Sequence, residues 1–156
     1  MELTEATKKG LQILKQISPF VSRGHLAGSI RRKKPIVRDI DIVVELKPNN
    51  IDKLKNFIFK LGEVKLKGDK LIRFIATDNA QVDIYIGTKE NYEPLLLIRT
   101  GSKEHNIKLT TRALSMNMQL TANGLIDKKT GKIIATSEKD IFKALKMNYV
   151  EPEKRN

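Results

Sequence analysis

Apolar residues recur along the chain with two different periods, and each period predicts a type of element. Residues 3–17 place apolar side chains at helical spacing, and residues 51–61 do the same between the capping residue Asn50 and Gly62. Alternating, β-branched stretches predict strands over 21–26, 39–44, 64–67, 70–77 and 81–86. The first half of the chain is therefore expected to form a mixed α/β lobe.

The second half of the chain has mainly helical patterns. Predicted helices over 91–99 and 103–117 are separated by Gly101, which marks a natural boundary. A weak hairpin pattern around 128–131 follows, and Ser137 can cap a last helix that runs to about residue 146. These features predict an α/β (α+β) chain with two domains, residues 1–99 and 100–156.

Charge adds information that the periodicity does not contain. The 156 residues are 40% apolar and carry 30 Lys and Arg against 18 Asp and Glu, a net charge of +12. Such an excess favours a phosphate polymer as partner, because binding releases condensed counterions, although a Lys-rich solvated surface has the same composition. The absence of Cys excludes disulfides, thiolate metal sites and a Cys nucleophile. Short apolar runs and a polar start predict an intracellular protein without a membrane anchor.

Acidic residues in two predicted strands suggest a metal site. Residues two apart in a strand share a face, so Asp39 and Asp41 lie side by side, and a divalent cation would relieve their repulsion. The same alternation places Asp83 on the polar face of a later strand, where it joins them if the strands are neighbours. Three carboxylates can hold two Mg²⁺ ions for phosphoryl transfer.

A Gly-Ser turn beside two arginines suggests a triphosphate site. Gly28 lets the backbone come close, the Ser29 hydroxyl can donate to phosphate oxygens, and Arg32 can pair with a terminal phosphate. Taken separately, the turn is commonly a basic loop and the Asp-x-Asp pattern a solvated strand face. Their joint spacing favours a nucleotide-binding site.

Several ordered motifs resemble one known family. Residues 28–32 with 39–41 resemble the catalytic signature of the X-family DNA polymerases, within the nucleotidyltransferase superfamily. Residues 100–106 are similar to that family's nucleotide-pocket turn, and residues 137–142 with Arg155 to its C-terminal end. The resemblance implies a nucleotidyltransferase palm, with a mixed sheet and flanking helices, followed by a small thumb-like lobe. It also implies a minimal form without the lyase domain, in a prokaryotic or viral cytoplasm.

The resemblance implies roles for individual residues. Asp39 and Asp41 would bind both metal ions, Mg²⁺ or alternatively Mn²⁺, and Asp83 would join the catalytic ion and help deprotonate the primer 3′-OH. The implied nucleotide-binding residues are Gly28, Ser29, Arg32, Thr100, Gly101, Ser102, His105 and Asn106. For His105, a plain capping role is the alternative. The residues expected to hold DNA phosphates are Arg31, Lys33, Lys34, Arg38, Lys108 and Arg112.

The expected function is metal-dependent addition of dNTPs to a primer at short gaps in duplex DNA, by a monomer. Two alternatives remain: a nucleotidyltransferase with a non-DNA acceptor, and a catalytically idle DNA-binding subunit. The chain departs from the family at Ile98 and Arg99, where an aromatic pair is usual, and at Thr110, where many members carry Arg. We therefore expect no aromatic ring beside the sugar.

Overall fold

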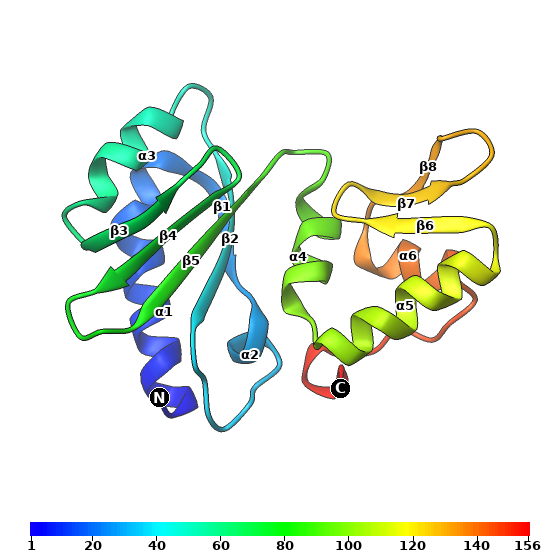
Figure 1. Cartoon of the computed structure of the whole chain (residues 1–156), viewed down its shortest axis with the longest axis horizontal. Coiled ribbons are helices and arrows are strands. Elements are labelled where there is room, and N and C mark those ends of the chain that lie inside the picture. The colour runs from blue at the N-terminus through cyan, green and yellow to red at the C-terminus, as the bar shows by residue number, and fades with distance from the viewer.

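The computed structural model describes residues 1–156, which form two lobes with a helix between them (Figure 1). The helices are α1 (Leu3–Ile17), α2 (Gly28–Arg31), α3 (Ile51–Ile58), α4 (Tyr92–Thr100), α5 (Lys103–Ser115) and α6 (Glu138–Ala144). The strands are β1 (Val21–Leu26), β2 (Ile40–Leu46), β3 (Gly62–Lys67), β4 (Leu71–Ala76), β5 (Gln81–Gly87), β6 (Met118–Thr121), β7 (Gly124–Asp127) and β8 (Ile133–Ala135). None of the helices combines the length and the apolar character needed to cross a bilayer.

The first lobe is built on a five-stranded sheet with the order β1-β2-β5-β4-β3. Only the central pair, β2 and β5, is parallel, so the sheet is mixed as expected. Alternation along β2 sends Ile40, Ile42 and Val44 to one face, where all three are fully buried. Asp41, Val43 and Glu45 therefore project from the opposite face.

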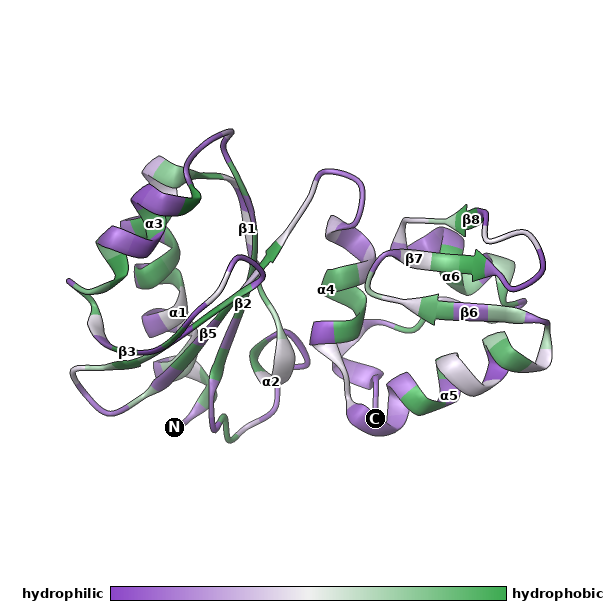
Figure 2. Cartoon of the chain, turned by 45° about the horizontal axis from the view of Figure 1, so that its top comes forward, coloured by the Kyte–Doolittle hydropathy of each residue, from purple (hydrophilic) through white to green (hydrophobic).

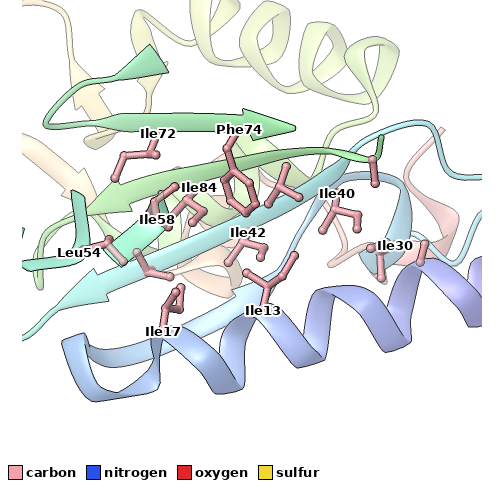
Figure 3. Close-up of a cluster of buried hydrophobic side chains, with 14 of the residues drawn as sticks. Ile13, Ile17, Ile30, Ile40, Ile42, Leu54, Ile58, Ile72, Phe74 and Ile84 are labelled. Carbon is pink, nitrogen blue, oxygen red and sulfur yellow. The ribbon is translucent and has the colours of Figure 1, made fainter. Parts of the chain in front are cut away.

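Helices α1 and α3 cover the apolar face of this sheet. Figure 3 shows Ile13 and Ile17 of α1 beneath the strands, close to Ile42, with Leu54 and Ile58 of α3 completing the cluster. Green and purple bands alternate along α3 in Figure 2, as expected of a helix with one apolar face. The other face of the sheet packs against α4 around Val43 and carries the polar side chains beside that contact.

The second lobe has a core of its own. Its three-stranded sheet, β6-β7-β8, packs with α5 and α6 around Leu109, Leu125 and Phe142. Helix α4 contributes to both lobes, because Leu97 joins this core whereas Tyr92 packs on the first lobe. The predicted boundary between residues 99 and 100 thus falls at the end of a helix that packs against both lobes.

Most predicted elements are confirmed, with shifts at their ends. The helix expected over 51–61 stops at Ile58, because β3 already begins at Gly62 and the chain needs a turn between them. The helix expected over 103–117 stops at Ser115, and Met118 opens the unpredicted strand β6. A four-residue strand has little periodicity of its own, and its pairing with β7 specifies it.

Candidate active site

Two of the predicted carboxylates stand side by side in the first lobe. The parallel register of β2 and β5 places Asp41 opposite Asp83, and the antiparallel register of β5 and β4 places Asp83 opposite Arg73. Asp39 lies just before β2 and is exposed. The face of the sheet away from the core therefore carries a row of Arg73, Asp83 and Asp41, with Asp39 at its edge.

Asp83 is almost completely enclosed by protein partners. It is 4% exposed. Its Oδ1 accepts a hydrogen bond from Arg73 Nε at 2.7 Å, and its Oδ2 accepts one from Arg73 Nη2 at 3.1 Å. Gln81 Nε2 and the Tyr85 hydroxyl lie 3.5 Å from the same carboxylate. Arg73 was not found by sequence reasoning, because only the pairing of β4 with β5 brings it here.

Asp41 has the opposite environment. Its carboxyl group accepts no hydrogen bond from the protein. Burial, followed by the negative charges of Asp83 and Asp39, raises the pKa of Asp41 to about 7, although Arg99 and Arg32 partly oppose this shift. A carboxylate with little solvent and no counter-ion is one that a bound cation would stabilise.

Gly28 allows the start of α2 to approach Asp41 closely. Its backbone has a φ of +54°, a conformation that L side chains rarely adopt. A Cβ at this position would also overlap the Oδ2 atom of Asp41. Glycine is thus required twice, for its backbone conformation and for the contact. The residues expected to form a Gly-Ser turn are in fact the first two of the short helix α2.

A cavity of about 410 Å³ opens between the two lobes beside Asp41. Six of the eight predicted nucleotide-binding residues line it: Gly28, Ser29, Arg32, Thr100, Gly101 and Asn106. Arg32 spans the cavity wall, because its Nη1 donates to the carbonyl oxygen of Thr100 at 2.6 Å. Arg32 Nε and Asn106 Oδ1 are buried and have no partner in the protein. The cavity wall thus retains unsatisfied hydrogen-bonding capacity.

The other two predicted residues, Ser102 and His105, do not line the cavity. Ser102 caps α5, and its hydroxyl accepts the backbone N–H of His105 at 3.2 Å. The His105 ring turns into the second lobe, 5.9 Å from the ring centroid of Phe142, and neither ring nitrogen has a partner. Burial, assisted by the charges of Arg155 and Lys108, lowers the pKa of His105 to about 4.

An aromatic ring does lie at the cavity, although α4 does not supply it. Tyr85 of β5 lines the cavity, and the Arg99 guanidinium carbon stacks 4.2 Å from its ring centroid. The prediction of no aromatic ring beside the sugar was based on Ile98 and Arg99 alone, the residues that directly precede the Thr100-Gly101 turn in the sequence. Since Tyr85 follows Asp83 by two residues, strand alternation was a signal that could have identified it.

The predicted DNA-binding cations differ in how far the protein already engages them. Arg31 donates to Thr100 Oγ1 at 2.7 Å and to Glu138 Oε1 at 2.5 Å, so it joins the two lobes. Arg112 donates to the carbonyl oxygen of Leu145 at 2.9 Å. Arg38, by contrast, is exposed and makes no hydrogen bond or ion pair with the protein.

The three lysines of the same set contact the C-terminal end of the chain. Lys33 lies 3.6 Å from Glu153, and Lys34 donates to the Asn156 side chain at 2.6 Å. Lys108 lies 3.5 Å from the Asn156 carbonyl oxygen. These contacts are at the surface, where such pairs are weak and exchange readily with a phosphate.

The donor chemistry at this site fits a hard divalent cation, but the groups are not gathered around one point. No cluster of three or more His, Asp or Glu side chains has the spacing of a metal site. Asp41 is unpaired and Asp39 is exposed, so both can turn toward an ion, whereas Arg73 occupies Asp83. Oxygen ligands of this kind suit Mg²⁺ or Mn²⁺.

Comparison with known proteins adds independent information. Residues 95–156 match the family described as DNA polymerase beta thumb. The chain is 27% identical over 135 residues to the DNA polymerase/3'-5' exonuclease PolX of Bacillus subtilis (strain 168), which covers 83% of this chain and 23% of that protein. It is 38% identical over 78 residues to the DNA nucleotidylexotransferase of Xenopus laevis, which covers 49% of this chain and 15% of that protein. The chain thus spans less than a quarter of the length of these relatives.

Solved structures with the same fold cover the whole chain. Leishmania infantum polymerase beta, in a ternary P/T complex, superimposes with a TM-score of 0.86 at 18% identity, over 100% of this chain and 76% of that one. Its ternary gap complex has a TM-score of 0.86 at 17% identity, over 100% and 70% of the two chains. These structures confirm the expected palm and thumb-like fold. With the thumb match and the curated relatives, they support the resemblance of this chain to the X family of DNA polymerases.

Proposed function

We propose that the chain is a metal-dependent DNA polymerase that transfers a nucleotide from a dNTP to a primer 3′-OH at short gaps in duplex DNA. The observation that carries this proposal is the juxtaposition of Asp41 and Asp83 on paired strands, beside a cavity lined by the Gly28-Ser29 turn and the Thr100-Gly101 turn. Acidic and phosphate-binding groups from four separate segments meet there. Repair synthesis is the setting that such a reaction would serve.

The cavity residues have complementary roles in this proposal. Ser29 and Arg32 would bind the triphosphate, because a hydroxyl and a guanidinium both donate to phosphate oxygens. The Thr100-Gly101 turn would lie against the sugar, and Asn106 would reach the edge of the base. The unpartnered Arg32 Nε and Asn106 Oδ1 support these roles, since both atoms retain capacity for a ligand.

The carboxylates Asp39, Asp41 and Asp83 would hold two divalent ions, with Mg²⁺ or Mn²⁺ as the cofactor. When bound, such ions supply positive charge to the phosphate oxygens and lower the pKa of an attacking hydroxyl. Asp83 would help to deprotonate the primer hydroxyl, the role that the family resemblance implies for it. The raised pKa of Asp41 supports the proposal, because it results from burial and from the neighbouring negative charges of Asp83 and Asp39, which a bound cation would offset.

DNA is the acceptor that the surroundings of the site favour. The similar solved structures are a ternary P/T complex and a ternary gap complex of Leishmania infantum polymerase beta. For this chain, the net charge of +12 and the unpaired Arg38 support binding to a phosphate backbone. We further propose a cytoplasmic monomer, with residues 1–99 as the catalytic palm and residues 100–156 as the nucleotide- and DNA-contacting lobe.

The proposal is tested by extension of a labelled primer on a one-nucleotide gap, with wild type and Asp41→Asn. Removing this charge should lower single-turnover incorporation at least 10²-fold, the magnitude typical of a major electrostatic group, while duplex affinity stays within about twofold. Asp52→Asn, on the exposed surface of α3, is the matched control and should keep full activity.

The alternatives give different results in the same experiment. Faster transfer to an RNA primer or to a small-molecule acceptor would favour another nucleotidyltransferase. Tight duplex binding by wild type without any incorporation would indicate a catalytically idle subunit. An Asp41→Asn protein as active as wild type would exclude Asp41 from the reaction.

A further inference from the structure

Arg73 occupies the place that a metal ion would need at Asp83. The two residues are opposed in register on β4 and β5, and Asp83 is in turn opposed to Asp41 on β2. Both carboxylate oxygens of Asp83 accept from one guanidinium, Oδ1 from Nε at 2.7 Å and Oδ2 from Nη2 at 3.1 Å. The pair is therefore bidentate, the strongest arrangement these groups can form.

A divalent ion and this guanidinium compete for the same charge. An ion held by Asp83 would bring two positive charges to a carboxylate that already has a cation on both oxygens. Because the Asp83 side chain is only 6% exposed, water screens this repulsion poorly. The guanidinium must therefore leave at least one oxygen before the ion can bind there with full strength.

Arg73 is able to make this movement, whereas Asp83 is not. The Arg73 side chain is 38% exposed, and no other protein group accepts a hydrogen bond from it. Its neighbour on β3 in the same register is the apolar Leu66, which cannot hold a guanidinium in place. Asp83 keeps Gln81 and Tyr85 at 3.5 Å, so contacts remain that orient the carboxylate after Arg73 leaves.

We propose that Arg73 is a resident counter-ion of Asp83, which neutralises this carboxylate in the metal-free protein and withdraws when a divalent ion binds. Arg73 thereby lowers the affinity of the site for metal and prevents Asp83 and Asp41 from repelling each other before the ion arrives. The inference rests on the proposed function, since it takes Asp83 as a metal ligand. Arg73 is a positioning residue in this role and need not touch the nucleotide.

The test measures Mn²⁺ binding in the absence of nucleotide and DNA, by the electron paramagnetic resonance signal of free Mn²⁺. The Arg73→Gln protein should bind Mn²⁺ about 10-fold more tightly than wild type, because a bidentate charged pair no longer competes. Lys65→Gln is the matched control: it removes one positive charge from the adjacent strand β3, where Lys65 pairs with the exposed Glu63. This control should stay within about twofold of wild type.

A second measurement covers the case in which Arg73→Gln folds poorly. Arg73→Lys keeps the charge but cannot form the bidentate pair, so its Mn²⁺ affinity should fall between those of wild type and Arg73→Gln. The thermal unfolding midpoint is followed in parallel, with chelator and with Mn²⁺. Arg73→Gln should unfold at a lower temperature than wild type in chelator, and Mn²⁺ should raise its midpoint by more.

Each other outcome overturns the inference. Equal affinity in wild type and Arg73→Gln would show that Arg73 does not compete, and weaker binding by Arg73→Gln would show that Arg73 prepares Asp83 for the ion. Both results leave the proposed function intact, because wild type still binds Mn²⁺. If neither protein binds Mn²⁺, the proposed metal-dependent function and the inference fail together.

Discussion

Asp41 and Asp83 stand side by side on paired strands, yet their surroundings differ completely. Asp83 has a guanidinium on both oxygens, whereas Asp41 has no partner and a pKa of about 7. His105 is a third buried titratable residue, 4% exposed, and its ring nitrogens bind nothing. At the residue scale, then, the partners that each buried group finds decide its charge and its role.

The unpartnered His105 predicts a specific pH dependence of stability. Its pKa is about 4 in the folded protein, below the usual 6.5, so the unfolded chain binds the additional proton between these values. The free energy of unfolding should therefore be unaffected by this group above about pH 6.5 and fall as the pH drops toward 4. From pH 7.5 to pH 4.5 the His105 contribution should fall by about 2 kcal/mol.

The measurement is urea unfolding at pH 7.5 and pH 4.5, in wild type and His105→Leu. The carboxylates titrate in both proteins, so the difference between the two profiles isolates the histidine. His105→Leu should lose less stability on acidification. Parallel profiles would mean that the ring is protonated as easily when folded as when unfolded.

At the scale of elements, one acid connects four segments. Glu138, at the start of α6, accepts from Arg31 of α2 and from Arg155 near the C-terminus, the latter at 2.8 Å. Its backbone N–H donates to Glu93 of α4 at 3.0 Å. Arg155 is fully buried, so its charge has almost no access to water. The relative position of the two lobes thus depends on a buried ion-pair network.

Loss of the charge at Glu138 should destabilise the protein strongly. Glu138→Gln leaves two guanidinium groups without a counter-charge, which should lower the free energy of unfolding by about 3 kcal/mol. Glu151→Gln, at an exposed position whose side chain has no partner, should change stability by less than about 0.5 kcal/mol. Urea unfolding at pH 7.5 compares the two, and an equal effect of both changes would contradict the role of the network.

At the scale of the whole molecule, the net charge of +12 overstates the number of cations available to DNA. Arg31 and Arg112 are engaged by internal acceptors, and Arg155 is fully buried. Arg38 remains exposed and unpaired. A phosphate backbone would therefore be held by a subset of the lysines and arginines, with the paired arginines holding the lobes together.

This distribution predicts how duplex binding responds to salt. Affinity should fall roughly 10³-fold between about 50 and 200 mM salt if about six phosphates are contacted. Arg38→Gln should reduce the slope of the double-logarithmic plot by about one, since one phosphate contact is lost. Lys15→Gln also removes one positive charge, from the last turn of α1, which covers the apolar face of the sheet. This control should leave the slope unchanged. A flat salt response, or equal effects of both changes, would contradict the binding of phosphates by the predicted cations.

The sequence by itself determined the elements and the faces of the first lobe. The alternation around Asp39 and Asp41 separated the acidic face from the apolar face, and the helical spacing over residues 3–17 predicted α1 with its bounds. The need for glycine at position 28 was predicted as well, although the residues there form the short helix α2. These features depend on neighbours within a few residues, and a local pattern is sufficient to specify them.

Only the tertiary structure decided which charges meet. The strand order β2-β5-β4 brought Arg73 to Asp83, and the packing of α4 on the first lobe brought Arg99 to the Tyr85 ring. The packing of α5 on α6 turned His105 away from the cavity. The fold likewise made Arg31 a link between lobes, because Glu138 lies 107 residues further along the chain. Partners so far apart in sequence are selected by sheet order and lobe packing, for which the local spacing of residues carries no information.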